Sequence, residues 1–419
     1  MKNIINEYKK FFYHLSKNVK LYLGVLFFVT FLSSAYRVLF SIYMINIGFT
    51  EIIVGQILSL QTLGIALGAI PITLFSQRIN KKNTLILGIV FMFISSFILL
   101  NFHNLYIMKI ASIIFGFSQA TIMILQAPII FENTAKEYRT MGFSIAFVFQ
   151  NIAFALSNLI LGHISQYFSI KNGSAFGNLI VLNGSTLLLI LAFIIALAFK
   201  GKSMTSSSKD KSFVYDIKNV FINYLKLLKG NSFSYLLQIA VIGLGAGMIV
   251  PFFSIYLKHT LSIKDGMVGN IMAISQIGTI IGGLLIPIIA KRLGNIRSII
   301  LCQILSIPFL ITIALPQGVL VVSTAFFFRS SLMNMANPLF RSLGMEIISK
   351  EKRTAMSGMI TLTNNLFRSI GIFIGGYLMY AYSYNTPYYF TILCYLIGTL
   401  IIYKVFYPRH KTSNSKAKA

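Results

Sequence analysis

Long apolar stretches follow one another along almost the whole chain, separated by short polar segments. Each stretch offers roughly 20 residues, the length at which an α-helix crosses a hydrocarbon core about 30 Å thick. The twelve stretches cover residues 21–46, 52–76, 84–101, 105–131, 140–166, 177–199, 233–258, 265–290, 298–316, 318–346, 355–382 and 387–407. Six precede a long polar segment and six follow it. The pattern predicts an all-α polytopic membrane protein with 12 transmembrane helices in two pseudo-symmetric six-helix bundles.

The polar segments divide the chain into five parts. We predict a cytoplasmic amphipathic N-terminal segment, an N-terminal bundle, a cytoplasmic linker, a C-terminal bundle and a basic cytoplasmic tail. These parts occupy residues 1–20, 21–199, 200–232, 233–407 and 408–419. In the linker, apolar residues between Val214 and Leu228 recur at helical spacing opposite lysines such as Lys226. This spacing predicts a basic amphipathic helix on the inner membrane surface, and a helix that binds a protein partner is the alternative.

The two halves also repeat each other in sequence. Residues of the first half return 214 positions later in two separate stretches, and one constant offset over such distances is not expected by chance. The repeated pairs are Gly55 and Gly269, Gly64 and Gly278, Gly68 and Gly282, Arg78 and Arg292, Glu132 and Glu346, Arg139 and Arg353, and Gly162 and Gly376. Two copies of one architecture in a strongly apolar chain are typical of a transporter.

Composition and charge narrow the class of protein further. Hydrophobic residues make up 56% of the chain, charged residues make up 11%, and soluble proteins are about one quarter charged. The net charge of +27 suggests nucleic-acid binding at first sight. The lysines and arginines, however, gather in the terminal segments, in the linker and after the second and eighth spans, which is the positive-inside pattern. We therefore predict a multi-pass plasma membrane protein with both termini cytoplasmic and no nucleic-acid partner.

The sequence gives no signal for a cofactor or a metal. Cys302 and Cys394 lie inside predicted spans, and no phosphate-binding Gly-Lys-Ser/Thr loop is present. The spans hold too few histidine, aspartate and glutamate residues for a catalytic constellation, so we do not expect an enzyme. The expected partners are the lipid bilayer and a small-molecule substrate. We expect a monomer, and the coupling ion stays open.

Short motifs in the loops resemble those of a known family. The loop after the second span reads SQRINKK, and its repeat after the eighth span reads AKRLGN. Both are similar to the cytoplasmic signature of the major facilitator superfamily. The spacing from Glu132 to Arg139, repeated from Glu346 to Arg353, is similar to the Glu-x6-Arg element of its sugar-porter branches. The resemblance covers nearly the whole chain and implies a twelve-helix secondary transporter that works by alternating access.

The chain departs from the family at the proposed inward gate. Gln77 and Lys291 stand where the family usually has an aspartate, so the charge that helps to hold that gate is missing. We hypothesise that pairs such as Arg78 with Glu132 replace it and lock the cytoplasmic side in outward-facing states. Ordinary solvated surface charge is the alternative, because an exposed ion pair contributes only about 0–1 kcal/mol. The predicted gate residues are Arg78, Lys82, Glu132, Arg139, Arg292, Glu346 and Arg353.

Pairs of glycines at four-residue spacing allow close helix packing. The pairs are Gly64 with Gly68, Gly278 with Gly282, and Gly371 with Gly375. In the family, helix 2 meets helix 11 and helix 8 meets helix 5 between the two halves. The resemblance therefore implies smooth glycine contacts there, over which one half rocks against the other, and static packing is the alternative. The sequence FSIY, repeated at the outer ends of helices 1 and 7, is a candidate outer gate.

The charges inside the spans bear on the substrate. All nine acidic residues fall in tails, loops or helix ends, so the usual carrier of a coupled proton is missing. Arg37 lies midway along the first span and Arg329 along the tenth, where a guanidinium costs at least about 2.5–3.5 kcal/mol. In the family fold both helices line the central cavity. Arg368 lies midway along the eleventh span, which is usually peripheral, so we give it less weight.

These arginines suggest an anionic substrate, because guanidinium groups bind phosphate and carboxylate in a bidentate manner. The alternative is that they bond backbone carbonyls or glutamines. The amides that we expect to orient the substrate are Gln119, Gln126, Asn334 and Asn365, and hydrogen bonding between helices is the competing explanation for them.

Three functions stay open at this point. By resemblance, the chain is a secondary active transporter that exports a small amphipathic or drug-like molecule. The buried arginines favour an organic-anion or organic-phosphate carrier or exchanger. A non-transporting membrane sensor or assembly partner on a transporter scaffold is the third reading.

Overall fold

The computed structural model describes residues 15–78, 80–135, 138–199, 213–315, 318–349 and 352–416, and the regular structure in these ranges is helical. The first half contains α2 (Lys17–Ala35), the π-helical turn η1 (Tyr36–Phe40), α3 (Ser41–Asn46), α4 (Glu51–Arg78), α5 (Lys81–Asn101), α6 (Leu105–Glu132), α7 (Arg139–Asn172), α8 (Ser174–Leu187) and α9 (Leu189–Leu197). The linker contains α10 (Phe213–Leu227). The second half contains α11 (Gly230–Ile249), the 3-10 turn η3 (Val250–Phe252), α12 (Phe253–Thr260), α13 (Asp265–Leu293), α14 (Asn295–Ala314), α15 (Val319–Met335), α16 (Asn337–Glu346), α17 (Arg353–Ala381) and α18 (Thr386–Lys416).

Each of the twelve predicted spans corresponds to one helix or to consecutive helices. Within the described residues, eleven of these spans are long and apolar enough to cross a membrane. The other is α17, which is 29 residues long and carries Asn364, Asn365 and Arg368 near its middle. A span with such a polar middle has to face the interior of the protein rather than lipid. The predicted fold class of two six-helix bundles is confirmed.

Side-chain capping explains where the helices begin better than hydrophobicity does. Hydrophobicity predicts the third span from residue 84, whereas α5 begins at Lys81. The Asn80 side chain accepts a hydrogen bond from the Lys82 amide at 3.0 Å, which satisfies an amide that the first helical turn leaves free. At the other end of the chain, α18 continues to Lys416 and so includes most of the predicted basic tail.

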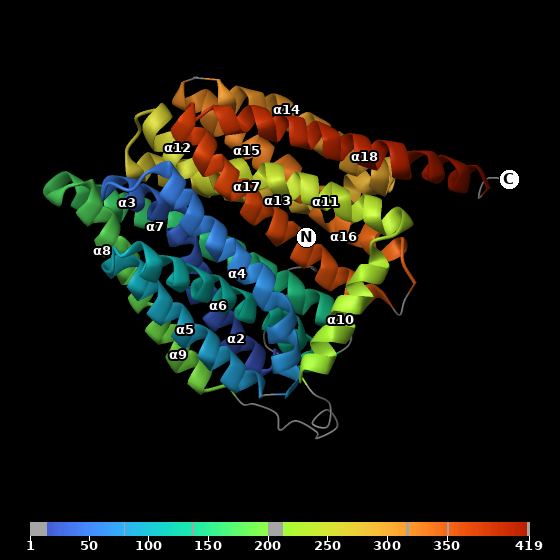
Figure 1. The fold of residues 1–419 in the computed structure, drawn as a ribbon, viewed down its shortest axis with the longest axis horizontal. Coiled ribbons are helices and arrows are strands. Elements are labelled where there is room, and N and C mark those ends of the chain that lie inside the picture. The colour runs from blue at the N-terminus through green and yellow to red at the C-terminus, as the bar shows by residue number, and fades with distance from the viewer. Residues whose placement is uncertain are drawn as a thin grey trace, which may run out of the picture.

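The helices form two bundles that lie side by side (Figure 1). We call α2 to α9 the N half and α11 to α18 the C half. We call one end of the molecule the terminal side: α2 and α17 begin there, and α18 ends there. We call the opposite end the far side: α3 ends there, and α4 and α13 begin there. The halves meet along α4 and α17, and α10 contacts both of these helices on the terminal side (Figure 1).

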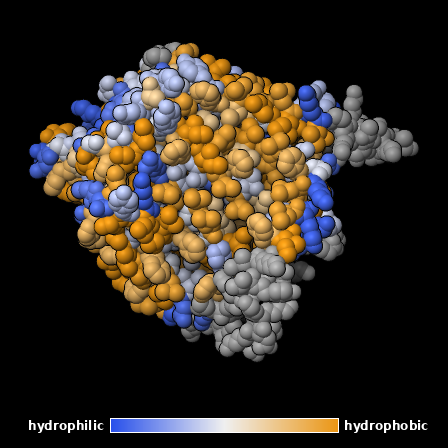
Figure 2. Space-filling model, viewed as in Figure 1, coloured by the Kyte–Doolittle hydropathy of each residue, from blue (hydrophilic) through white to orange (hydrophobic). Residues whose placement is uncertain are grey.

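The surface of the molecule is suited to lipid. Apolar side chains cover the middle of the face in Figure 2, and hydrophilic side chains gather towards its two ends. Large apolar side chains exposed on the whole molecule include Tyr106, Ile110, Leu284 and Leu320. A soluble monomer rarely exposes so much contiguous apolar surface, whereas a bilayer requires it. The fold therefore carries its own membrane-facing belt.

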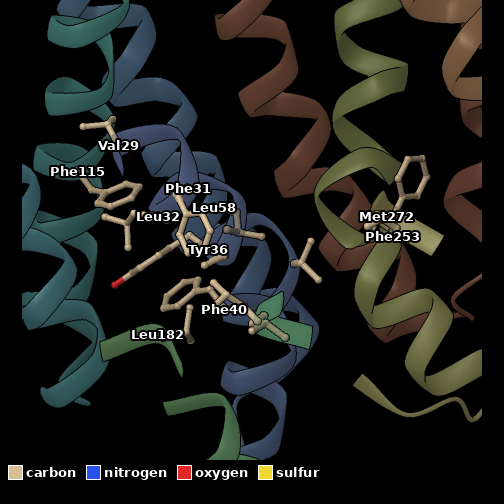
Figure 3. Packing of buried hydrophobic residues seen from close by; sticks show 14 of the residues in the cluster. Val29, Phe31, Leu32, Tyr36, Phe40, Leu58, Phe115, Leu182, Phe253 and Met272 are labelled. Carbon is tan, nitrogen blue, oxygen red and sulfur yellow. The ribbon is translucent and has the colours of Figure 1, made fainter. Parts of the chain in front are cut away.

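The first and seventh spans deviate from a regular α-helix at related places in the two halves. η1 interrupts the first span, and η3, which contains Pro251, interrupts the seventh. In η1 the Tyr36 ring stacks on Phe40 and on Phe115, with centroids 5.1 and 4.9 Å apart (Figure 3). The Tyr36 hydroxyl donates to the Ser96 carbonyl oxygen at 2.8 Å. This packing holds a π-helical turn of the kind that occurs frequently at functional sites.

Hydrogen bonds repeat between the halves as the sequence does. Tyr43 donates to a carbonyl oxygen at the end of α5 at 3.0 Å, and Tyr256 donates to the matching carbonyl oxygen at the end of α14. Both tyrosines end the repeated sequence FSIY. The serines of the two copies, Ser41 and Ser254, lie 3.1 Å apart and join the halves on the far side. The candidate outer gate thus lies where the halves touch, and its role as a gate stays a prediction.

The helix α10 forms where the linker is predicted to be amphipathic. Tyr224 and Leu227 are buried, whereas Phe221, Leu225 and Leu228 are exposed. One apolar edge of α10 therefore packs on the protein and a second edge is free. Its location on the membrane surface stays a prediction. Residues 1–14 of the predicted N-terminal segment lie outside the described residues.

Candidate functional site

Arg37 lies in the π-helical turn η1, in the middle of the first span. Its neighbours Tyr36 and Val38 are buried, but the Arg37 side chain is exposed. The guanidinium carbon lies 4.8 Å from the centre of the Phe154 ring of α7, which places a cation over an aromatic face. The π-helical turn thus directs an exposed charged side chain towards α7, although the residues around it are packed.

Arg329 lies in α15 of the C half and is only 4% exposed. One terminal nitrogen donates to the Tyr395 hydroxyl at 3.0 Å, and the guanidinium carbon lies 4.9 Å from the centre of the Phe253 ring. The Nε atom is buried and has no hydrogen-bond partner. Buried donors are nearly always paired, so a free one calls for an explanation. One explanation is that a bound molecule supplies the missing acceptor.

Arg368 of α17 is the third cation of this region. It lies near both Arg37 and Arg329, close enough for like-charge repulsion with each. Our prediction gives Arg368 little weight because helix 11 is usually peripheral. In the structure α17 packs closely on α11: a Cβ atom on Gly247 of α11 would lie 2.3 Å from the Arg368 carbonyl oxygen. The glycines of α11 are the sequence signal for this close approach, because their missing side chains let α17 come near.

Among the residues that the structure describes, no acidic side chain pairs with these three arginines. All nine acidic residues of the chain lie in tails, loops or helix ends. Within the described ranges the ion pairs are Lys81–Glu132 and Lys258–Asp265, and each lies close to a helix end. Three guanidinium groups without a counter-charge at mid-membrane depth are costly, and an anion that binds between them relieves the cost.

The four predicted amides all have hydrogen-bond partners in this conformation. Gln119 donates to Ser33 at 3.1 Å. Gln126 accepts a hydrogen bond from Gln150 at 3.4 Å. Asn334 and Asn365 each donate to a carbonyl oxygen one turn earlier in their own helix, both at 2.9 Å. Hydrogen bonding within the protein therefore accounts for their positions, and their contact with a substrate stays a prediction.

Comparison with known proteins identifies the family. The sequence model of the Major Facilitator Superfamily matches residues 22–241 and 235–419. The chain belongs to this superfamily. It is a family of transporters rather than enzymes, as the sequence predicts.

Solved structures of other transporters share the fold of this major facilitator chain. The nucleoside transporter NupG is similar with a TM-score of 0.75 at 15% identity, over 93% of this chain and 99% of NupG. A bacterial homologue of the human lysosomal transporter Spinster, in an inward-facing and occupied conformation, has a TM-score of 0.72 at 13% identity, over 93% and 97% of the two chains. The peptide transporter POT in complex with sulfate has a TM-score of 0.73 at 11% identity, over 94% of each chain. No curated protein sequence matches the chain.

The predicted gate residues of this major facilitator protein lie on the terminal side. Glu132 pairs with Lys81, and Lys82 donates to the Leu197 carbonyl oxygen at 2.6 Å. Glu346 accepts a hydrogen bond from Ser342 at 2.7 Å.

Of the remaining gate residues, those with described side chains do not form the hypothesised pair of Arg292 with Glu346. Arg353 donates to a backbone carbonyl oxygen, and Arg292 is exposed. Neither ion pair among the described residues includes Arg292 or Glu346. The side chains of Arg78 and Arg139 lie outside what the structure describes. The lock that we hypothesise for outward-facing states stays a prediction.

The three glycine pairs do not lie between the halves. Gly64 and Gly68 pack on α6, where a Cβ atom on Gly64 would lie 2.4 Å from a carbonyl oxygen. Gly278 and Gly282 pack on α15 in the same manner, and Gly371 and Gly375 pack on α11. The prediction of moving contacts between the halves is therefore wrong for these pairs. They hold neighbouring helices of one half together, because only a missing side chain allows backbones to approach this closely.

Two other glycine pairs, already marked by the repeat, join the halves on the far side. A Cβ atom on Gly55 of α4 would lie 3.1 Å from the Cα atom of Gly376 of α17. A Cβ atom on Gly162 of α7 would lie 3.0 Å from the Cα atom of Gly269 of α13. The helix pairs expected from the family thus do meet, through different glycines. Within the described residues, hydrogen bonds between the halves also lie on the far side or near mid-membrane.

Proposed function

We propose that the protein is a secondary transporter that exchanges small organic anions across the plasma membrane by alternating access. The observation that carries the proposal is the group of three mid-membrane arginines, one with a buried unpaired donor, without a carboxylate at their depth. A phosphate or carboxylate group supplies both the missing charge and the missing acceptor.

Exchange, rather than one-way movement, follows from the same charges. Alternating access requires the central site to close on both sides before it opens to the other side. Closing removes the exposed Arg37 guanidinium from water beside Arg329, which is already buried, and burial of an uncompensated charge costs several kcal/mol per ion. A bound anion lowers that cost. We therefore expect the loaded carrier to switch quickly and the empty carrier to switch slowly, so that inward movement of one anion is coupled to outward movement of another.

Two aromatic rings extend the site beyond its charges. Phe154 lies beside Arg37, and Phe253 lies beside Arg329. A substrate whose acidic group binds the guanidinium groups brings its remaining atoms against these rings. An amphipathic organic anion fits both parts, and export of such a molecule is the direction that the family resemblance favours.

The sidedness of the molecule follows from its basic residues. Lys81, Lys82, Lys291 and Arg292 lie at helix ends on the terminal side. By the positive-inside rule, we infer that this side faces the cytoplasm. The hydrogen bonds between the halves lie on the far side and near mid-membrane, so we infer that the far side is closed in the described conformation, as in an inward-facing transporter.

Counterflow in proteoliposomes tests the proposal. Vesicles that contain the purified protein are loaded with one anion, and entry of labelled anions is measured with and without that internal load. The panel compares organic phosphates and carboxylates with neutral and cationic compounds of similar size. The variants Arg37→Gln, Arg329→Gln and Arg368→Gln test the site. Arg341→Gln, at an exposed position of α16, is the matched control.

We expect anion entry that depends on internal anion, and a loss of affinity of about tenfold or more in each of the three variants, because a hydrogen bond to a charged group contributes about 1.5–3 kcal/mol. The control should transport as the wild type does. Transport of cationic or neutral compounds that the three variants leave unchanged would remove the anion proposal. Anion binding without flux in sealed vesicles would instead support the sensor reading.

A further inference from the structure

The far side carries two acidic residues at equivalent positions of the repeat. Glu51 is the first residue of α4 and Asp265 is the first residue of α13, 214 positions later. Each is followed after four residues by a glycine that contacts the other half, Gly55 or Gly269. Neither acidic residue has a part in the proposed binding of the anion, so their shared position needs a separate explanation.

Asp265 belongs to the C half but binds the N half. Its Oδ2 atom accepts hydrogen bonds from Asn178 at 2.9 Å and from Ser165 at 3.1 Å. Its Oδ1 atom pairs with Lys258 of its own half at 2.6 Å. Asn46 donates to the side-chain oxygen of Asn178 at 2.8 Å, which orients the amide towards Asp265. Asp265, Ser165 and Asn178 are all buried, so water does not compete for these bonds.

Glu51 makes the reciprocal contact from the N half to the C half. The hydroxyl of Tyr384, between α17 and α18, donates to the Glu51 carboxylate. His259 of the C half stacks on the Tyr384 ring with the centroids 5.6 Å apart. Burial and the neighbouring carboxylate raise the pKa of Tyr384 above its usual value, so that its hydroxyl remains a donor. Each carboxylate therefore binds the half to which it does not belong.

The glycine contacts allow both carboxylates to reach across. A Cβ atom on Gly376 would lie 2.6 Å from the Glu51 carbonyl oxygen. A Cβ atom on Gly162 would lie 3.0 Å from the Asp265 carbonyl oxygen. The first turn of each acidic helix thus lies directly on a glycine of the other half. Side chains at these glycines would hold the helices too far apart for the hydrogen bonds to form.

We propose that Asp265 and Glu51 form a two-part latch that holds the far side closed, and that both carboxylates must release the opposite half before the far side opens. The Asp265 part is the stronger of the two, because it is buried and accepts two hydrogen bonds across the interface. The latch acts whatever the substrate is, so its test is independent of the proposed function.

A second explanation is that these carboxylates only stabilise their own helices, since negative charge is favourable at a helix start. That contribution is present whether the far side is open or closed. Asn178 separates the two explanations. It is uncharged, lies within α8 of the N half and donates to Asp265 across the interface, so replacing it removes the bond between the halves without changing the charge at the start of α13. Asn101 is its matched control: it donates to Asn183 at 3.2 Å, also on the far side, but both belong to the N half.

Distances between spin labels measured by double electron–electron resonance test the latch in the full chain without substrate. Labels at residues 106 and 320, whose native Tyr106 and Leu320 are about four-fifths exposed, report the far side. Labels at residues 83 and 297 report the terminal side. The background carries Cys302→Ala and Cys394→Ala to remove the native thiols. The variants are Asp265→Asn, Glu51→Gln, Asn178→Ala and the control Asn101→Ala.

We expect Asp265→Asn to raise the ratio of far-open to far-closed molecules by about tenfold, as for the loss of a hydrogen bond to a charged group. Glu51→Gln and Asn178→Ala should act in the same direction by less, and Asn101→Ala should leave the distances unchanged. The latch is refuted if Asp265→Asn and Asn178→Ala both give the wild-type distances. If Asp265→Asn does not fold, Asn178→Ala and Ser165→Ala decide the question from the N half.

Discussion

Replacing Gly269 with alanine is expected to push the two halves apart on the far side. A Cβ atom at this position would lie 2.3 Å from the carbonyl oxygen of Asn158 in α7. Carbon and carbonyl oxygen are normally at least about 3.3 Å apart, so α7 and α13 have to separate by about 1 Å. The clash exists only while the far side is closed. Alanine therefore destabilises the far-closed state and leaves the far-open state unaffected.

Overpacking of this kind costs about 1–3 kcal/mol. A free-energy difference of that size between two conformations corresponds to a population shift of about 5- to 150-fold. The label pair at residues 106 and 320 should accordingly show a larger share of long far-side distances in Gly269→Ala, and the pair at residues 83 and 297 should show a larger share of short terminal-side distances.

The same helix provides two controls. Gly278 packs within the C half, where a Cβ atom would lie 2.6 Å from the Phe327 carbonyl oxygen, and Gly283 has no atom within 4 Å of such a position. Gly278→Ala should lower the thermal stability without moving the label distances. Gly283→Ala should neither lower the thermal stability nor move the label distances. Its gain in helix propensity, about 1 kcal/mol, is the same as in Gly269→Ala and Gly278→Ala. Unchanged distances in Gly269→Ala, or an equal change in Gly278→Ala, would refute the division of the glycines into two kinds of contact.

Three further variants test other parts of the structure. Tyr395→Phe removes the hydroxyl that orients Arg329. It should weaken anion binding about threefold to tenfold, as expected for the loss of about 1 kcal/mol, and the shift in melting temperature on adding anion measures that binding. Gly358→Ala should detach α10 from α17, because a Cβ atom there would lie 2.0 Å from the Tyr224 hydroxyl oxygen, and limited proteolysis should then cut the linker faster. Asn80→Ala should lower the stability of the protein by about 1 kcal/mol through loss of the cap of α5 while transport by the remaining folded protein is unchanged.

The sequence was sufficient for the fold because hydrophobicity and repetition act over long segments. Apolar length places the spans, and the offset of 214 residues shows that there are two related bundles. Span ends were predicted less well, since a single capping residue such as Asn80 moves a helix start by three residues. The arginines Arg37 and Arg329 were identifiable because a cation in the middle of an apolar span is costly wherever it points.

The remaining parts of the site depend on contacts that the sequence does not contain. Arg368 lies near the other two arginines on α17, which glycines of α11 allow to approach closely, and the pairing of these two helices is visible only in the fold. The glycine pairs illustrate the same limit. Four-residue spacing on Gly64 and Gly68 predicts close packing correctly, but it does not name the partner helix. The isolated glycines Gly55 and Gly269, which have no such spacing, are the ones that join the halves.

The placement of charge separates binding from gating in this protein. Cations without a counter-charge occupy the middle of the spans, whereas every carboxylate lies towards a helix end, in a loop or in a tail. In the proposed mechanism, a bound anion acts on the mid-span cations, because it lowers the cost of closing both sides around the site. In the proposed latch, the far-side carboxylates act on gating, because their bonds to the opposite half form only while that side is closed. The two proposals together assign separate tasks: the anion promotes the passage between conformations, and Asp265 and Glu51 set which conformation is favoured at rest.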